Sequence, residues 1–223
     1  MKISIVIAAY NAAETIKKAV KSVLEQNFPP DDFEVVVVND GSTDNTLNVL
    51  QKFGDKIKII NQENQGAVPA ANKGFREATG DYVIKLDADD AFEPDILKEM
   101  AEVLDTNSQI DFVYSDYYEQ NQNKTKLVST KHNLFNTVSI GVMFRRQKLE
   151  EAGFYKENIV FAEYDLLLRT INKWKGFHIS KPLFIYIRRK QSITTSKGVG
   201  KFIVQLKKIH PNKVKEIAKI RDY

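Results

Sequence analysis

Residues 81–94 read DYVIKLDADDAFEP, an apolar run that leads into three carboxylates within four residues. The part from Tyr82 to Leu86 has the length and the β-branched composition of a buried strand. Pro94 is suited to open a helix, because a proline in the first turn loses no intrahelical hydrogen bond. We therefore expect the carboxylates at the carboxyl end of a strand, where open α/β sheets bind their ligands.

The three carboxylates favour a cation site. In an extended backbone Asp87 and Asp89 would project to one face and could share one hard divalent cation, which would relieve their repulsion. Turn formation and helix capping remain the alternative explanation for acidic residues between a strand and a helix. A calcium-binding EF-hand loop is excluded, because it would need Gly at Phe92 and Glu at Lys98. Lys85 shares the strand parity of Asp87 and might pair with it.

Strands and helices alternate through the first half of the chain. We expect strands over 3–9, 33–38, 57–60 and 82–86, with a helix after each of them. Asn11 and Glu14 have the spacing of a capping box for the first helix. Crossovers of this length predict a parallel, doubly wound sheet.

The second half of the chain is less regular and predicts a mixed arrangement. Helical spacing occurs over 97–104 and 163–174, and strands are expected over 112–118, 126–129, 138–144 and 177–187. Trp174 and the aromatic residues of 112–118 are more typical of a core than of a sugar-binding platform. The end of the chain from Lys201 is basic and amphipathic, with a break near Pro211.

Composition limits the classes of protein that fit. The chain has 223 residues and 43% hydrophobic content, enough for the core of one α/β domain. The absence of cysteine excludes disulfides, zinc thiolate sites and thiol catalysis. We expect a cytoplasmic protein, because we recognise neither a signal peptide nor an apolar run of the roughly 18 residues that span a membrane.

The net charge of +4 is unevenly distributed. Residues 168–223 contain 15 Lys and Arg against two acidic residues, so this segment carries +13. The remainder has 18 basic and 27 acidic residues and carries −9. A basic end on an acidic body suggests an anionic partner such as a diphosphate, a membrane surface or nucleic acid, and a solvated surface is the alternative.

Four motifs follow one another along the chain: IVIAAYN (5–11), VNDGSTDNT (38–46), NQG (64–66) with ANKG (71–74), and LDADD (86–90). In this order and spacing they resemble the motifs of the family 2 glycosyltransferases. The likeness covers roughly 3–195 and continues weakly through 163–169 and 186–192. The QxxRW signature of processive members is absent. The resemblance implies the GT-A fold, a mostly parallel, Rossmann-like sheet flanked by helices with a mixed acceptor-side half.

The same resemblance implies an inverting, metal-dependent sugar transfer from a nucleoside diphosphate sugar, with a UDP-sugar favoured, to a hydroxyl of a glycan or lipid-linked saccharide. By the matching positions, Ala9 and Tyr10 would border the base and Asp40 would hydrogen-bond its edge. Asp89 would bind Mn²⁺ or Mg²⁺ directly, and Asp87 would lie nearer the ribose or a metal-bound water. A divalent ion would neutralise charge on the leaving diphosphate.

An inverting transfer needs a base that takes the acceptor's proton. The resemblance assigns this role by aligning residues 166–169 with the family's Leu-x-x-Arg helix. This alignment places Glu163 at the base position, and Asp165 is the alternative. Asp165 could instead be a first-turn charge favoured by the helix dipole. A Glu in place of the usual Asp moves the carboxylate by one methylene.

Three further positions depart from the family pattern. Ala162 replaces the first acid of the pair, Ala71 replaces an Arg, and Lys190 replaces a His. Lys190, with Arg188 or Arg189, could still contact the diphosphate as a point charge.

The resemblance also divides the chain into a nucleotide-sugar-binding half (1–95), an acceptor half (96–197) and a basic amphipathic C-terminal segment (198–223), all within one GT-A domain. That last segment could dock at the inner face of a membrane, or its apolar stripe could pack on the domain or in a homodimer. A nucleic-acid partner is not expected. Two alternative functions stay open: a non-catalytic nucleotide-sugar-binding scaffold and, with less support, a sugar nucleotidyltransferase.

Overall fold

The computed structural model describes residues 2–122, 124–131, 133, 141–159, 162–188 and 199–218. Its elements, in chain order, are β1 (Ile3–Ala9), α1 (Ile16–Leu24), β2 (Phe33–Asp40), α2 (Thr46–Gln51), β3 (Lys58–Gln62), α3 (Ala67–Glu77), β4 (Tyr82–Asp87), β5 (Ala91–Phe92), α4 (Ile96–Thr106), β6 (Phe112–Gln120), β7 (Thr125–Val128), β8 (Val142–Arg145), α5 (Arg146–Glu151), α6 (Ala162–Thr170), β9 (Gly176–Ile187), α7 (Val199–Ile209) and α8 (Val214–Ile217). Short 3-10 turns occupy Pro30–Asp32, Gly54–Lys56 and Pro211–Lys213.

The described strands form one sheet in the order β3-β2-β1-β4-β8-β6-β9-β5, with β7 paired to β6. Strands β3, β2, β1 and β4 are parallel to one another, as the alternation of strands and helices predicts. The second half is mixed, because β8 runs antiparallel to β4 and β6 while β6 and β9 run parallel. The predicted fold class, an α/β sheet with a mixed second half, is therefore confirmed.

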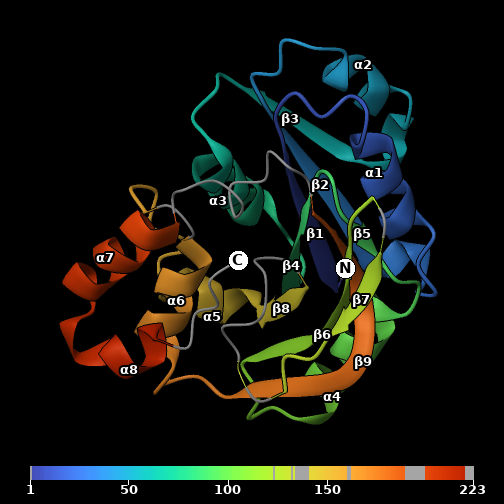
Figure 1. Ribbon diagram of the computed structural model, residues 1–223. Helices are drawn as coiled ribbons and strands as arrows, with labels where there is room; N and C mark the ends of the chain where they lie inside the picture. The colour runs from blue at the N-terminus through green and yellow to red at the C-terminus, as the bar shows by residue number, and fades with distance from the viewer. Residues whose placement is uncertain are drawn as a thin grey trace.

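Helices cover both faces of the sheet (Figure 1). On one face, α1 and α4 pack on Ile3, Ile5 and Ile7 of β1. On the other, α3, α5 and α6 pack on Val6 and Val83. Because side chains alternate along a strand, a central strand buried on both faces is apolar throughout, which explains the continuous apolar run of β1. Trp174 and Phe112 also belong to the second cluster, so the prediction that they are core residues is confirmed.

The C-terminal helices form a third cluster with α6, and Figure 1 shows α7 and α8 on the far side of that helix. Phe202, Leu206 and Ile217 are buried against Tyr164 and Leu168. The apolar stripe of α7 thus packs on the domain, which was one of its two sequence-based interpretations. None of the helices in the described part of the chain has the length and apolar character needed to cross a bilayer.

Two local predictions were wrong. Helix α1 begins at Ile16, with Thr15 at the N-cap position, so Asn11 and Glu14 form no capping box. Asn11 instead has a positive φ of 47° and hydrogen-bonds to another loop. The helix predicted over 163–174 ends at Thr170, where the backbone N–H groups of Lys173 and Trp174 both bond to the Thr170 carbonyl.

Helix α3 lies unusually close to β1 at Gly74, where an added Cβ would sit 2.3 Å from Cγ1 of Val6. We predict that Gly74→Ala destabilises the protein by about 1–3 kcal/mol, because overpacking outweighs the gain in helix propensity. Urea unfolding measures this difference. Lys73→Ala, which removes an exposed ion pair to Glu77, is the control and should cost less than about 1 kcal/mol. Equal stability of Gly74→Ala and the native chain would contradict the close packing.

Candidate functional site

The register of the parallel strands brings the predicted donor-binding positions to one edge of the sheet. Ala8 pairs with Asp87, Ala9 pairs with Asn39, and Asp40 pairs with Gln62. Tyr10, the residue after β1, is 52% exposed at this edge. The carboxyl ends of three neighbouring strands therefore present the residues that the sequence singled out.

Asp40 is buried and holds the turn before α3. Its Oδ1 accepts hydrogen bonds from the Gln62 side chain (2.8 Å) and the Gln65 N–H (2.9 Å), and its Oδ2 accepts one from the Gly66 N–H (2.8 Å). A carboxylate can accept about four hydrogen bonds, so capacity for one more donor remains. The predicted contact of Asp40 with a nucleotide base stays a prediction.

The loops after β1 and β2 are bound to each other. Oδ1 of Asn11 accepts from the Thr43 N–H (2.8 Å), and the Ala12 N–H donates to Oγ1 of Thr46 (2.8 Å). Asp44 accepts from the Ala13 N–H at 3.1 Å. These bonds fix Tyr10 beside the end of β2.

The carboxylates after β4 lie in a turn. Asp87 is the last residue of the strand, and its carbonyl accepts a hydrogen bond from the Asp90 N–H (3.1 Å). The backbone is therefore not extended from Asp87 to Asp89. The alternation that was expected to point both side chains to one face does not apply here. Asp89 is half-buried in this turn.

Asp90 is almost completely buried. Its Oδ1 accepts from the Ile187 N–H at the end of β9 (2.6 Å), and its Oδ2 has no hydrogen-bond partner among the described residues. Burial raises the pKa of Asp90 well above its usual range, and the carboxylates of Asp87 and Asp89 raise it further. Asp87, Asp89 and Asp90 therefore bring three carboxyl groups to the end of β4.

That concentration of carboxylates fits a hard divalent cation. The described residues contain no group of three or more His, Cys, Asp or Glu side chains placed to hold an ion alone. Mg²⁺ needs only one or two protein carboxylates when substrate phosphates supply further oxygen ligands. Asp87 and Asp89 match that smaller ligand set.

The basic residues predicted to contact the diphosphate follow β9. Arg188 donates from its backbone N–H to the Gln120 carbonyl (2.8 Å) and from Nη1 to Glu119 (3.2 Å). Its neighbour Ile187 bonds to Asp90, so Arg188 lies next to the carboxylate turn. Lys190 lies outside the described residues.

Lys85 joins Glu163 to the end of β4. Its ammonium lies 2.8 Å from Oδ1 of Asp87 and 3.1 Å from Oε1 of Glu163. Burial disfavours the ammonium, but the carboxylates of Asp87 and Glu163 outweigh this effect and raise the pKa of Lys85 above its usual range. The predicted pairing of Lys85 with Asp87 is confirmed, and the second partner was not foreseen.

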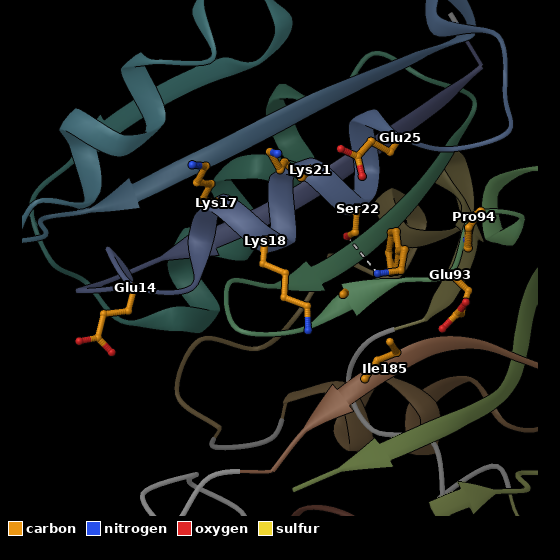
Figure 2. Close-up of a pocket in the computed structure, with 11 residues that line it drawn as sticks. Glu14, Lys17, Lys18, Lys21, Ser22, Glu25, Glu93, Pro94 and Ile185 are labelled. Atoms are coloured by element: carbon orange, nitrogen blue, oxygen red, sulfur yellow. Dashed lines mark hydrogen bonds between the residues drawn. The ribbon is translucent and has the colours of Figure 1, made fainter. Parts of the chain in front are cut away.

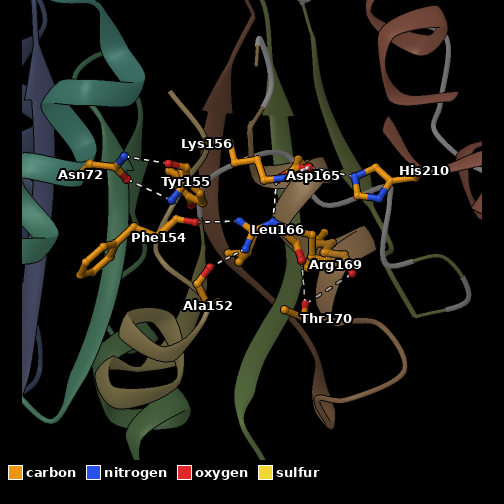
Figure 3. Close-up of polar contacts among 11 residues, drawn as sticks. Asn72, Ala152, Phe154, Tyr155, Lys156, Asp165, Leu166, Arg169, Thr170 and His210 are labelled. Carbon is orange, nitrogen blue, oxygen red and sulfur yellow. Dashed lines mark hydrogen bonds and ion pairs between the residues drawn. The ribbon is translucent and has the colours of Figure 1, made fainter. Parts of the chain in front are cut away.

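Asp165, the alternative base, is fully buried (Figure 3). Its Oδ2 accepts from Nε of Arg169 (2.7 Å), and its Oδ1 contacts Nε2 of His210 (2.8 Å). Arg169 also donates to the carbonyls of Ala152 and Phe154. Asp165 therefore joins α6 to the C-terminal segment and, through Arg169, to the loop before α6.

The loop before α6 is fixed from its other side by Asn72 of α3. The Asn72 amide donates to the Tyr155 carbonyl (2.8 Å) and accepts from its N–H (3.1 Å), as Figure 3 shows. The sequence analysis gave no role to Asn72 or His210. The ANKG motif was the available signal for Asn72, whereas a single His before a Pro carries none.

A groove of about 560 Å³ lies beside α1 and β5 (Figure 2). Its lining consists of Glu14, Lys17, Lys18, Lys21, Ser22, Glu25, Ala91, Phe92, Glu93, Pro94 and Ile185. This lining includes none of the residues predicted for the donor, the metal or the base. The lining contains three lysines and three glutamates, so its charge favours neither an anion nor a cation.

Parallel strands with a carboxylate-rich edge and helices on both faces define an open α/β protein, a class in which ligands generally bind at the carboxyl ends of the strands. The family model described as Glycosyl transferase family 2 matches residues 4–162. The putative teichuronic acid biosynthesis glycosyltransferase TuaG of Bacillus subtilis is 31% identical, over 82% of this chain and 86% of that protein. The chain therefore belongs to glycosyltransferase family 2.

Solved structures share its GT-A-type fold. Staphylococcus aureus TarS in complex with UDP-GlcNAc has a TM-score of 0.81 at 22% identity, over 98% of this chain and 69% of that one. The mannosyltransferase PcManGT of Pyrobaculum calidifontis, in complex with GDP-Man and Mn²⁺, has a TM-score of 0.75 at 18% identity, over 98% and 68%. In three further relatives, the matched region covers only 35%, 19% and 33% of the protein's own length.

The Asp165–His210 contact gives a testable prediction. We expect His210→Ala to lower stability by about 1–3 kcal/mol, because a fully buried carboxylate loses a partner. The melting temperature should fall by several degrees. His210→Gln, which retains a side-chain N–H donor, should recover part of the loss. The control is Lys208→Ala, at an exposed position of α7; a loss no larger than this control would show that the contact contributes nothing.

Proposed function

We propose that this chain is an inverting, metal-dependent glycosyltransferase. It takes a sugar from a nucleoside diphosphate sugar, with a UDP-sugar favoured, and transfers it to a hydroxyl of a glycan or lipid-linked saccharide. One observation carries the proposal: Glu163 and Asp87 share the ammonium of Lys85, at 3.1 and 2.8 Å. The expected base and the expected donor-binding carboxylates are thus neighbours, as a transfer between donor and acceptor requires.

The donor would lie across the strand ends, within the half formed by residues 1–95. Ala9 and Tyr10 would border its base, and the exposed Tyr10 ring offers a surface for stacking. Asp40 would bind the edge of the base, and Arg188 and Lys190 would contact the diphosphate. The nucleotide sugars bound to TarS and PcManGT support a donor of this class.

Asp89 and Asp87 would hold Mn²⁺ or Mg²⁺. When bound, such an ion neutralises charge on the leaving diphosphate. The place of Asp87 and Asp89 at the carboxyl end of β4 supports a cation at this position, as does the Mn²⁺ in PcManGT.

Glu163 would accept the proton of the acceptor hydroxyl while that oxygen attacks the anomeric carbon. The bond from the anomeric carbon to the diphosphate oxygen breaks on the opposite face, so the configuration inverts. Asp165 is less suited to this role, because its carboxylate is fully buried and bound by Arg169 and His210. The acceptor would approach from the half formed by residues 96–197.

A non-catalytic relative that binds nucleotide sugar is the second candidate. Ala71, Ala162 and Lys190 replace residues that the family uses, and these replacements favour it. A sugar nucleotidyltransferase has less support, because the loop after β1 contains no Gly-rich phosphate-binding sequence. Turnover separates a transferase from a scaffold, since both would bind a nucleotide.

Thermal unfolding tests the donor and metal site. We expect one of UDP, GDP and TDP to stabilise the protein, and only when Mn²⁺ is present. At 100 times its dissociation constant the nucleotide should add about 2.7 kcal/mol to the free energy of unfolding. The melting temperature should then rise by a few degrees. Asp89→Asn should abolish the shift. Asp55→Asn, an equal charge change at an exposed position, should keep it. Absence of any shift with all three nucleotides would remove the basis of the proposal.

Turnover tests the base. Glu163→Gln should lower the transfer rate by about 10²- to 10⁴-fold, as expected for loss of a general base, and should leave nucleotide-induced stabilisation unchanged. Glu151→Gln, half-exposed on α5, is the matched control. The anomeric configuration of the product, determined by NMR, reports the stereochemistry. Retention of configuration would exclude the inverting mechanism, and full activity of Glu163→Gln would exclude this base.

A contact with an anionic membrane surface is proposed for the C-terminal segment. Val204, Ile209 and Val214 are 54%, 37% and 47% exposed. Lys207 and Lys208 lie among them and are also exposed. Apolar side chains surrounded by lysines match the surface of an interfacial helix, and a lipid-linked acceptor would be reached from such a position.

Charge reversal tests the membrane contact without uncovering the buried face of α7. We predict that Lys207→Glu, Lys208→Glu and Lys215→Glu together weaken binding to phosphatidylglycerol-containing vesicles at least about tenfold, since each lysine near the surface contributes about 1 kcal/mol. The control reverses Lys52, Lys56 and Lys98, which are exposed elsewhere. Equal binding by both triple variants in a vesicle sedimentation assay would exclude this surface.

A further inference from the structure

We propose that Lys85 is a positioning residue for the base Glu163. The inference rests on the proposed function, because it takes Glu163 as the group that accepts the acceptor's proton. It goes beyond that function by assigning a role to a residue that none of the four family motifs contains.

The surroundings of Lys85 show why its partners matter. Lys85 is 8% exposed in a strand whose neighbouring residues Ile84 and Leu86 are fully buried. Removing an ammonium from water costs several kcal/mol unless opposite charges compensate it. Asp87 and Glu163 supply that compensation at 2.8 and 3.1 Å. The ammonium therefore holds both carboxylates in defined positions.

The length of the Glu163 side chain is matched to this contact. Glu163 stands on the first turn of α6, and its Oε1 reaches Lys85 of β4 across the space between helix and sheet. An aspartate at the same position would end one methylene earlier and would lose this contact in the present arrangement of α6 and the Lys85 side chain. The glutamate that replaces the family's usual aspartate and the lysine in β4 thus form a matched pair.

The neighbouring replacements are uncharged and buried. Ala71 and Ala162 are 1% and 0% exposed, and both pack in the cluster that contains Val83 and Tyr155. Val83 and Lys85 point to the same face of β4, because side chains alternate along a strand. Ala71 and Ala162 are the positions at which the family pattern has a basic and an acidic residue. Here both carry only a methyl group, on the face of β4 where Lys85 binds Glu163.

The contact with Lys85 fixes the orientation of the Glu163 carboxylate. The bond to Oε1 restricts the rotation of the Glu163 carboxylate and so directs Oε2, the oxygen that would receive the proton. A displacement of about 1 Å between reacting groups can cost about 10²-fold in rate. A glutamate without this anchor would populate several rotamers, and only a fraction of them would face the acceptor.

A double-substitution cycle tests the inference with Lys85→Met, Glu163→Asp and the double variant. Methionine keeps the length of the side chain and removes its charge. We expect Lys85→Met to lower the transfer rate at saturating donor at least about tenfold in the native background. In the Glu163→Asp background the same change should lower the rate several-fold less than in the native background, because the contact with Glu163 is already lost and only the contact with Asp87 remains to be removed. Single turnovers with enzyme in excess give rates for slow variants.

Ile84→Met, a buried change on the opposite face of β4, is the matched control and should keep the native rate. An equal effect of Lys85→Met in both backgrounds would show that Lys85 acts on the donor or only on the fold, and no effect in the native background would also overturn the inference. Failure of the proposed function is recognised separately, since the native chain would then show no turnover, or Glu163→Gln would keep full activity, whatever the cycle shows.

Discussion

The parallel register of β1, β2 and β4 is the constraint on which the candidate site depends. It aligns the last residues of three strands, so that Ala9, Asp40 and Asp87 meet at one edge although they are far apart in the sequence. The register follows from continuous apolar strands that are covered by helices on both faces. Polar groups thus gather at the end of a buried apolar layer.

Polar contacts between loops turn this edge into a defined surface. Asp40 holds the turn before α3, Asn11 holds the loop after β2, and Asn72 holds the loop before α6. Each of these side chains binds backbone N–H or C=O groups that would otherwise lose water without compensation. The candidate site is therefore built from short polar residues whose bonds are made within the protein, and from the carboxylates at the end of β4, of which Asp87 is paired with Lys85.

Several assignments followed from sequence because their causes are local. The strand 3–9 is set by its apolar run, and the carboxylates of 87–90 follow a strand whose end is marked by its composition. Where local signals compete, the sequence reading was less accurate. Asn11 is a residue type favoured as a helix cap, but its side chain instead accepts hydrogen bonds from a loop 32 to 33 residues further along the chain.

The sequence by itself determined the alternation of strands and helices, the carboxylate edge and, through four ordered motifs, the glycosyltransferase family. Only the tertiary structure decided that Lys85 binds Glu163, 78 residues away, and that His210 closes on Asp165, 45 residues away. The physical reason is the range of the forces that shape each feature. Hydrophobic periodicity and turn chemistry act over a few neighbouring residues, whereas a buried ion pair exists only once the packing of helix on sheet has brought its partners together and removed the water between them.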